Sequence, residues 1–592
     1  MPFKSVLTPH HSIPPPILAI LVGRLPQVST TIQDVAEEAA AAAAATAAAA
    51  GKKDKANTDT EDDSWDNDWG WGDDDDDDDD EGEEENEDHT KASPADTDSQ
   101  DTATTPALAP LTEPYLVSAS ANGHYLVLAH ESKFLVLELI QSDGEYSAVG
   151  QGSGCEAEGE TITAILCIPL FVPSIRKNQM FVMAGYSTGW IRVFSETGTM
   201  LTAQLLEPSP VVSLKLRTPP PVFKVSPHAI QHEDEEITIL FQNKRVVSID
   251  GQSLWMVLRV CDGQRESGID ASRMQTAFAY KKYEFQKQEQ IKDVISLGPS
   301  PPLSQSTMLD GSVSTTHTTY PFPANSTSRY IAVGGHPMLC YYATSESTRP
   351  LMSAVSMASY VVSRVTSPVF SLAKSWWTGS ASSTPSSRSN SPTPYVPDMH
   401  PPPSHIEPAC ALSPTLTIND SYRRITSISA APPSTSAQRH TLAVTSDMLG
   451  RVILWDVQSG EMIRMWKGIR DAVCGWVEIY DDNDDDDDQR DNNTSMRASR
   501  VLLFLVVYSE RRGLVLTYQM RHGKQVGMYR IGQGWRLVQC GREPLGSSMV
   551  STERRRMAMQ KNEGECGYLA KCLLIGPDGQ IRNVEIENVK RS

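Results

Sequence analysis

The chain has 592 residues and a formal net charge of −22 at pH 7, and residues 61–88 alone contain 19 Asp or Glu and no Lys or Arg. All other residues together therefore carry only −3, which argues against the clustered Lys and Arg that a nucleic-acid groove needs. The nine cysteines occur without C-x-x-C pairs or His partners at metal spacing, which excludes the common zinc motifs and is typical of a reducing compartment.

The first segment, residues 1–110, is low in sequence complexity, and we expect it to form a disordered tail with order beginning near Tyr115. The apolar run at 17–23 follows three prolines and precedes no small-residue cleavage site, so we expect no signal peptide. No apolar stretch approaches the roughly 20 residues that span a bilayer. We therefore expect a soluble, cytoplasmic protein.

Three tryptophans, Trp65, Trp69 and Trp71, lie inside the acidic run SWDNDWGWGDD. One interpretation is a solvated tail whose tryptophans have no role. The alternative is a docking peptide, because tryptophan is a favoured anchor in partner pockets and acidic flanks steer a peptide toward a basic surface. Both interpretations stay open at this point.

From Tyr115 onward, short apolar runs recur in pairs around turns, from YLVSASANGHYLVLAH to YLAKCLLIGPDGQIRNVEIEN near the C-terminus. This pattern predicts an all-β fold over residues 111–592: a WD-like β-propeller of about seven irregular blades. Three polar or Pro/Ser-rich insertions account for the irregular spacing, and we place them at 262–328, 351–424 and 480–499.

The segment GYSTG at 185–189 fits the G-x-S-x-G pattern of serine hydrolases, which places its serine on a sharp strand-to-helix turn. A strand-like alternation, WIRVFSETG, follows it instead of a helix. We therefore expect Ser187 in a hairpin turn. No phosphate-binding loop, dinucleotide fingerprint or zinc spacing occurs, so the sequence predicts no enzyme and no cofactor.

At helical spacing, the apolar residues of 351–377 fall on one face and the serines on the opposite face, so this segment predicts an inserted amphipathic helix. Pro368 interrupts it, so the segment forms either one helix or two shorter ones. One interpretation is a helix packed on the propeller. The other is a membrane-binding helix that senses lipid-packing defects, because a weakly charged serine face lies opposite bulky residues. The candidate membrane-binding residues are Val365, Val369, Phe370, Leu372, Trp376 and Trp377.

The stretch GRVILWDVQSGEMIRMWKGIRDA at 450–472 begins as a blade strand that ends on Trp455-Asp456 before a glycine turn. Its second half gathers charges around a tryptophan, and its candidate partner-binding residues are Arg464, Trp466, Lys467, Arg470 and Asp471. The alternative is that the charged residues form ordinary salt bridges around a buried Trp466.

Several motifs together give the chain a resemblance to a known family. These are DNDWGWGDD, ITAILCIPL, GWIRVFSETGTMLTAQLL, ITILFQNKRVVSIDG, AYKKYEF, GRVILWDVQSGEMIRMWKGIRDAVCGW and RVLLFLVVYSERRGLVL. The chain resembles the N-terminal domain of the non-catalytic, regulatory subunit of the Rab-three GTPase-activating protein complex, over roughly residues 60–592.

The resemblance implies a partner role. A separate catalytic subunit then supplies GTPase activation on Rab proteins, and the heterodimer is also tied to nucleotide exchange on a Rab of the endoplasmic reticulum. Family members usually continue into a long helical region beyond the part that this chain matches. The resemblance assigns no catalytic residue to this subunit. The alternative is a generic propeller adaptor in trafficking or autophagy that binds lipid through its inserted helix.

Overall fold

The computed structural model describes most of the chain after Tyr115 and a short segment at the N-terminus. The described residues are 3–22, 115–140, 144–172, 177–218, 235–266, 278–300, 327–345, 406–432, 442–480, 501–520, 522–540, 545 and 569–588. All of them belong to one compact unit, residues 1–39 and 110–592.

The described strands form six hydrogen-bonded sheets, called A to F here. Sheet A contains, in spatial order, β2 (Leu116–Ala119), β3 (Tyr125–His130), β4 (Lys133–Ile140), β5 (Glu145–Gly152), β1 (Phe3–Ser12), β29 (Gln580–Asn588), β28 (Lys571–Ile575) and β27 (Arg536–Cys540). Sheet B contains β6 (Ile162–Val172), β7 (Lys177–Tyr186), β8 (Trp190–Ser195) and β9 (Met200–Leu205). Sheet C contains β10 (Val211–Arg217), β11 (Glu236–Phe241), β12 (Arg245–Asp250), β13 (Tyr280–Phe285) and β17 (Cys410–Leu412).

The remaining sheets have four strands each. Sheet D contains β14 (Gln290–Ser300), β15 (Thr327–Gly335), β16 (Leu339–Ser345) and β18 (Pro414–Ile418). Sheet E contains β19 (Ile425–Ala430), β20 (Leu442–Asp447), β21 (Val452–Asp456) and β22 (Glu461–Trp466). Sheet F contains β23 (Ala472–Tyr480), β24 (Val501–Ser509), β25 (Leu514–Gln519) and β26 (Gln525–Arg530). The two described helices are α1 (Pro15–Val22) and α3 (Gly251–Glu266).

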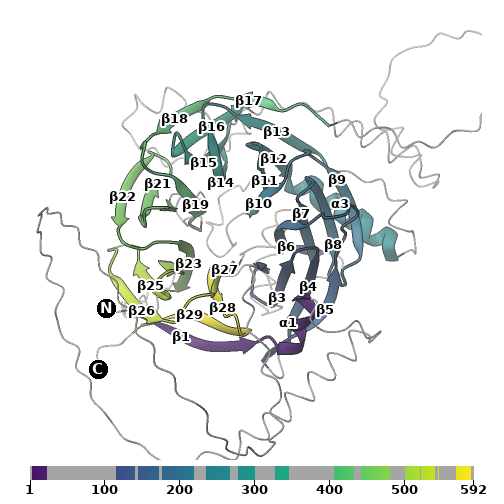
Figure 1. Cartoon of the computed structure of the whole chain (residues 1–592), viewed down its shortest axis with the longest axis horizontal. Helices are drawn as coiled ribbons and strands as arrows, with labels where there is room; N and C mark the ends of the chain where they lie inside the picture. The colour runs from purple at the N-terminus through teal and green to yellow at the C-terminus, as the bar shows by residue number, and fades with distance from the viewer. Residues whose placement is uncertain are drawn as a thin grey trace, which may run out of the picture. The chain divides into compact units, whose positions relative to one another are not determined.

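The sheets are arranged in a ring, as a β-propeller (Figure 1). Sheet A consists of two antiparallel four-stranded halves, which meet where Ser12 of β1 pairs in parallel with Glu145 of β5. The two halves of sheet A and the five other sheets make seven units around the ring. Within the described residues, one apolar cluster is buried between each unit and the next, which gives seven clusters. The strand runs predicted about seven units. Hydrogen bonding gives six sheets because the single pair between β1 and β5 joins two of the units into sheet A.

The prediction that order begins near Tyr115 is wrong for residues 3–22. Strand β1 pairs antiparallel along β29, from Phe3 opposite Asn588 to Ser12 opposite Gln580, so the two ends of the chain complete one four-stranded half of sheet A (Figure 1). Ile17 and Leu21 of α1 are buried between the two halves. The low-complexity composition of residues 23–114 obscured this short apolar segment, whose strand partner β29 lies at the other end of the chain.

Two of the three predicted insertions also contain ordered strands. β13 and β14 lie inside 262–328, and β17 and β18 lie inside 351–424. β17 adds to β13 in parallel as the outermost strand of sheet C, and β18 then completes sheet D beside β16. These edge strands are short and mostly exposed, so no long alternating apolar run marks them in the sequence. Most of the third insertion, 480–499, lies outside the described residues.

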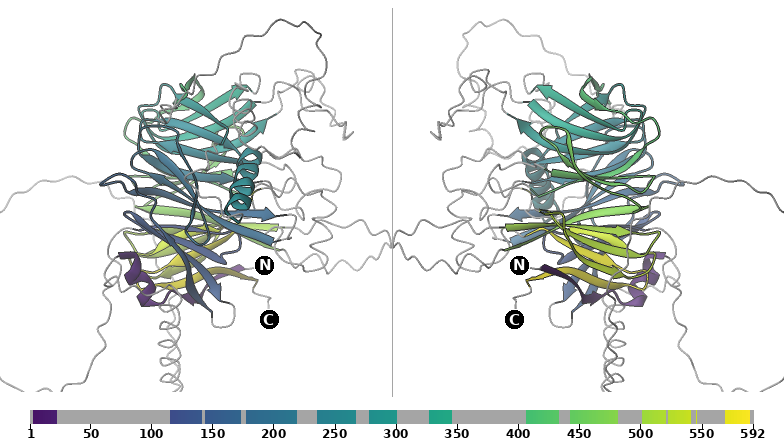
Figure 2. Two further views of the ribbon diagram at one scale, coloured as in Figure 1. Left: turned by 90° about the vertical axis from the view of Figure 1, so that its right-hand side faces the viewer. Right: turned by 90° about the vertical axis from the view of Figure 1, so that its left-hand side faces the viewer.

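The direction of the strands gives the ring two distinct sides. Because neighbouring strands within each four-stranded unit are antiparallel, the loop after every fourth strand emerges on the side that carries α1. Figure 2 shows α1 and α3 on opposite sides of the ring. The first strands of sheets C, D, E and F end on the α3 side, at Arg217, Ser300, Ala430 and Tyr480. The described loops that join one sheet to the next are short, and they lie on the α1 side. Neither described helix is long and apolar enough to cross a bilayer.

Candidate functional site

The five predicted partner-binding residues of the described chain lie on the last strand of sheet E and in the loop that follows it. Arg464 and Trp466 belong to β22, the outermost strand of that sheet, and Lys467, Arg470 and Asp471 belong to the loop that leads to β23 of sheet F. The predicted strand at Val452–Asp456 is confirmed as β21, the neighbour of β22. The charged half of the motif is thus a crossover between two sheets on the α1 side of the ring.

Trp466 anchors this crossover. Its ring lies 4.9 Å from that of Tyr518 in sheet F, with an angle of 38° between the ring planes. The side chain is half-buried and packs against the apolar cluster between sheets E and F. Trp466 therefore contributes to packing between sheets E and F, while part of its side chain stays exposed.

Arg464 is separated from the other charged residues of the motif. Its guanidinium donates a 3.4 Å hydrogen bond to the carbonyl oxygen of Gly523, in the turn between β25 and β26. That turn lies at the opposite end of sheet F from the loop 467–471, because β25 runs the length of the sheet between them. The structure thus does not bring Arg464 together with Lys467 and Arg470.

Backbone hydrogen bonds hold the crossover loop on both sides. Ile469 donates to the carbonyl oxygen of Gly450 at 2.8 Å, and Glu510 donates to that of Asp471 at 3.2 Å. The hydroxyl of Ser509 donates to the carbonyl oxygen of Arg470 at 2.8 Å. Asp471 has a φ of +52°, in the left-handed region that is uncommon for non-glycine residues but that Asp adopts more readily than most. The loop is therefore fixed by both sheets.

Three neighbouring loops extend the same surface. The amide of Met448 donates to the carbonyl oxygen of Arg424 at 3.1 Å, so the loop before β19 adjoins the β20–β21 turn. The carboxyl of Asp447 fixes that turn by accepting from the amide of Arg451 at 2.8 Å, and burial raises its pKa. We call residues 422–424, 448–451, 467–471 and 510–512 together the crossover surface.

The crossover surface carries a local excess of positive charge. Its exposed basic residues are Arg424, Lys467, Arg470, Arg511 and Arg512. The structure gives none of these five an ion-pair partner among the described residues, whereas Arg423 is paired with Asp420 at 2.8 Å. Asp471 is the exposed acidic residue of the surface, and Glu510 is half-buried.

Large apolar side chains are exposed next to these charges. Tyr422 is 87 % exposed, Met448 60 % and Leu449 51 %. Sequence reasoning missed Tyr422, Arg424, Met448, Leu449, Arg511 and Arg512, because only folding brings their loops beside RMWKGIRDA. A usable signal was the position of SERRG at 509–513, which falls between two strand-like runs and therefore in a turn.

Ser187 lies in the β7–β8 turn, as the sequence predicted. Its hydroxyl accepts a 3.1 Å hydrogen bond from the amide of Thr161, and its amide donates to the carbonyl oxygen of the same residue at 2.9 Å. The hydroxyl therefore ties the turn to the preceding crossover loop. Antiparallel strands on both sides replace the strand-to-helix turn of a serine hydrolase.

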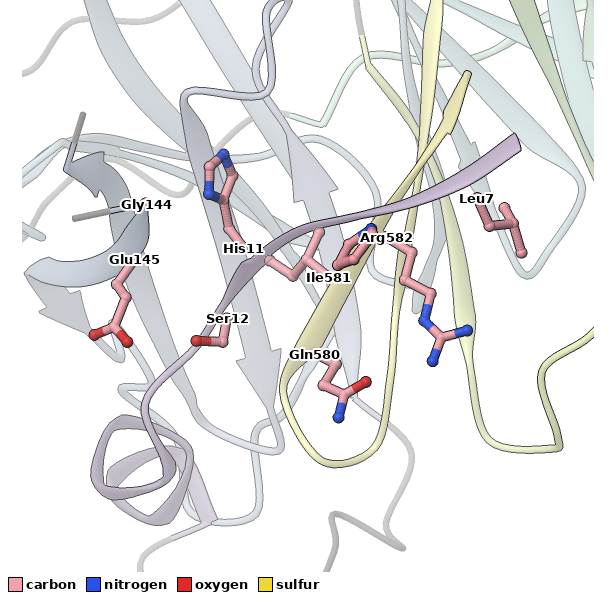
Figure 3. A pocket seen from close by; sticks show the side chains of 9 residues that line it. Leu7, His11, Ser12, Gly144, Glu145, Gln580, Ile581 and Arg582 are labelled. Atoms are coloured by element: carbon pink, nitrogen blue, oxygen red, sulfur yellow. The ribbon is translucent and has the colours of Figure 1, made fainter. Parts of the chain in front are cut away.

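A pocket of about 620 Å³ lies at the closure of the ring, where β1 passes between β5 and β29 (Figure 3). His11 and Ser12 are consecutive on β1, and Figure 3 shows their side chains pointing in different directions, so they do not form a nucleophile–base pair. The guanidinium of Arg582 lies 4.9 Å from the ring of Trp535. The pocket's polar groups thus do not converge on one point.

The part of the chain that the structure describes contains no group of three or more His, Cys, Asp or Glu side chains placed to hold a metal ion. The remaining predicted site residues lie outside the described residues. These are Trp65, Trp69 and Trp71 of the acidic segment, and Val365, Val369, Phe370, Leu372, Trp376 and Trp377 of the predicted membrane-binding helix.

A comparison with protein families finds a match over most of the described chain. Residues 111–538 match the family described as "Rab3 GTPase-activating protein regulatory subunit N-terminus". The match runs from just before β2 to β27, and it includes the crossover surface.

Solved structures show only distant similarity. Sqt1 of Saccharomyces cerevisiae is 11 % identical, with 80 % of this chain and 84 % of that chain covered and a TM-score of 0.33. Raptor of Chaetomium thermophilum is 8 % identical, with 80 % of this chain and 28 % of that chain covered and a TM-score of 0.35. Similarity at this level carries no functional argument, and the fold rests on the strand pairing described above.

Proposed function

Since the chain belongs to the family of the Rab3 GTPase-activating protein regulatory subunit, we propose that it binds a separate catalytic subunit and lets that subunit act on a Rab-family GTPase. The observation that carries this proposal is the family match over residues 111–538. The proposed setting is vesicle or endoplasmic-reticulum membrane traffic, from the cytoplasm. Nucleotide exchange by the assembled complex is part of the same proposal.

The division of labour has a chemical basis. GTPase activation needs positive charge placed on the transferring phosphoryl group, commonly by an arginine that reaches into the nucleotide site of the GTPase. Such an arginine must be positioned accurately against the substrate. The exposed arginines of the crossover surface instead surround a loop fixed by main-chain hydrogen bonds on the α1 side of the ring. That arrangement suits holding a partner better than inserting into a nucleotide pocket.

The crossover surface is the proposed contact with the catalytic subunit. It lies within the region that matches the family, and its loops are short and held by both sheets, so it is preformed. Exposed aromatic and apolar residues beside unpaired arginines are also the usual composition of a protein–protein interface. Binding there requires little ordering of this chain.

The test is capture of the purified catalytic subunit by the full-length chain in solution. We expect a stable complex with the wild type, weaker capture by Arg470→Glu, and unchanged capture by Lys524→Glu. Lys524 is the matched control because it is an exposed basic residue of sheet F at the opposite end of the strands. Failure of the wild type to form a complex contradicts the proposed function. Equal capture by all three proteins would show that the contact lies outside the crossover surface.

The alternative function, a propeller adaptor that binds lipid through residues 351–377, rests on the sequence pattern alone. Its direct test is flotation of the full-length chain with neutral liposomes of high and low curvature. Binding to the curved liposomes that is lost in the double variant Trp376→Ala/Trp377→Ala supports peripheral membrane contact. Absence of binding to either liposome contradicts it.

A further inference from the structure

We propose that the crossover surface recognises an acidic peptide segment that carries a bulky apolar residue. This inference rests on the proposed function for the identity of the partner, and it adds the chemistry of the segment that the surface binds. It follows from three observations: unpaired exposed basic side chains, exposed apolar side chains beside them, and a backbone that is fixed before binding.

The loops that carry the basic side chains are in direct contact with one another. Gly468, with a φ of +76°, turns the crossover loop so that the guanidinium of Arg512 lies 3.5 Å from where a Cβ atom of Gly468 would be. Gly450, with a φ of +84°, contacts Arg470 so closely that a Cβ atom there would lie 2.7 Å from its Cγ. Lys467 and Arg470 are thus placed between two turns that carry Arg511, Arg512 and the exposed Leu449.

Positive charges on adjoining loops repel one another. The described residues supply no ion-pair partner to the five exposed basic side chains. A bound segment with several carboxylates removes this repulsion. Carboxylates also match guanidinium groups geometrically, because the planar guanidinium presents a fork of donors. The adjoining side chains of Tyr422, Met448 and Leu449 provide the apolar contact for one large residue of the same segment.

A peptide fits the surface better than a membrane or a nucleic acid. Asp471 is exposed among the basic residues, and Glu510 is half-buried beside them. The negative charges of a lipid surface or a phosphate backbone repel the carboxylates of Asp471 and Glu510. A peptide of defined sequence can place a neutral or basic residue opposite them. The mixed charge pattern therefore favours a partner whose charges are arranged in sequence.

The probe is a fluorescein-labelled synthetic 14-residue peptide with eight Asp or Glu and one central Leu, titrated with full-length protein by fluorescence anisotropy. A second peptide replaces every Asp and Glu by Asn and Gln, and a third replaces the Leu by Ser. The titration is repeated on a full-length variant in which the Asp and Glu of residues 61–88 are replaced by Asn and Gln. This keeps the chain's own acidic run from screening the peptide.

We expect binding of the acidic peptide that weakens as salt rises, and weaker binding of both altered peptides. Charge reversal in Lys467→Glu, Arg470→Glu or Arg512→Glu should each weaken the affinity about 3- to 10-fold, while Lys524→Glu leaves it unchanged. Each variant must keep the wild-type midpoint of thermal unfolding.

Two results overturn the inference. One is failure of the acidic peptide to bind at low salt, or an affinity that is the same for the wild type and for the variant that combines Lys467→Glu, Arg470→Glu and Arg512→Glu. The other is tighter binding to phosphatidylserine vesicles or to single-stranded RNA than to the peptide, lost in the same variants, because this assigns the surface to a membrane or a nucleic acid. Capture of the catalytic subunit is measured separately, so its failure is distinguishable from failure of peptide binding.

Discussion

Ile469 and Gly450 are joined by a 2.8 Å hydrogen bond from the amide of the first to the carbonyl oxygen of the second. This bond links the loop that leaves sheet E to the turn between two inner strands of the same sheet. The next residue, Arg470, is thereby pressed against Gly450. The direction of the Arg470 side chain therefore depends on a glycine that lies 20 positions earlier in the sequence.

Gly450→Ala tests this dependence. The new methyl group meets Arg470, and the φ of +84° is unfavourable for alanine, so the variant should be less stable and should bind the acidic peptide more weakly. Gly532→Ala is the matched control, because its φ is +92° and a Cβ atom there meets no described atom within 4 Å. Equal loss of stability in the two variants, measured by chemical unfolding, would show that the contact with Arg470 is unimportant.

The N-terminal strand should stabilise the whole ring. Deleting residues 1–22 removes β1 from β29 and α1 from the apolar cluster that joins the two halves of sheet A, so thermal unfolding should shift to a much lower temperature. Deleting residues 61–88 should leave it nearly unchanged, because so acidic a segment buries little apolar area.

A single substitution gives the same test without truncation. Ile17 is 1 % exposed, so Ile17→Ala should cost about 2–5 kcal/mol of unfolding free energy. Ile463→Ala, at a residue that is 52 % exposed, is its control. If Ile17→Ala unfolds at the wild-type temperature, α1 does not close the ring.

A buried carboxylate between sheets C and D makes stability depend on pH. Burial raises the pKa of Glu236, but the ion pair with Arg217 at 3.1 Å and hydrogen bonds from Ser248, Ser296 and Tyr330 outweigh it, so the pKa lies below its usual 4.5. A lowered pKa stabilises the fold above the unfolded-state value, and this stabilisation is lost as the pH falls through the folded-state value.

Glu236→Gln should therefore lower stability at pH 7, because it leaves Arg217 without its counter-charge, and should flatten the loss of stability below about pH 4.3. Glu461→Gln, at an exposed residue of β22, should change neither. Thermal unfolding measured from pH 3 to pH 7 gives both quantities. If Glu236→Gln loses stability at acid pH as steeply as the wild type, the lowered pKa of Glu236 does not cause that loss.

Trp466 should matter for stability more than for recognition. Trp466→Phe keeps a ring against Tyr518, so we expect a small loss of stability and nearly unchanged peptide affinity. Trp466→Ala empties part of the contact between sheets E and F and should cost up to about 3 kcal/mol. Peptide affinity that falls in Trp466→Phe at full stability would place the ring in the binding surface instead.

The sequence predicted the propeller because alternating apolar runs and turns are local signals, and β21 with its neighbouring glycine turn follows them closely. It missed β1 because that strand is defined by its pairing with β29, more than 560 residues away. It missed β17 and β18 for a similar reason, since edge strands need little apolar character.

The candidate site was predicted only in part. Lys467, Arg470 and Asp471 are contiguous in the motif and stay together in the fold. Arg424, Leu449 and Arg512 join them through contacts between loops that no local pattern encodes. Arg464, although close in sequence, lies two residues before the end of β22, and its side chain reaches Gly523 in the turn at the opposite end of sheet F.

The proposed regulatory role is tested by GTP hydrolysis by a purified Rab-family GTPase. The rate is measured with this full-length chain alone, with the catalytic subunit of the family's complex alone, and with both together. We predict no acceleration by the chain alone and faster hydrolysis with both proteins than with the catalytic subunit by itself. Acceleration by the chain alone, or no difference between the catalytic subunit with and without it, would contradict a regulatory role.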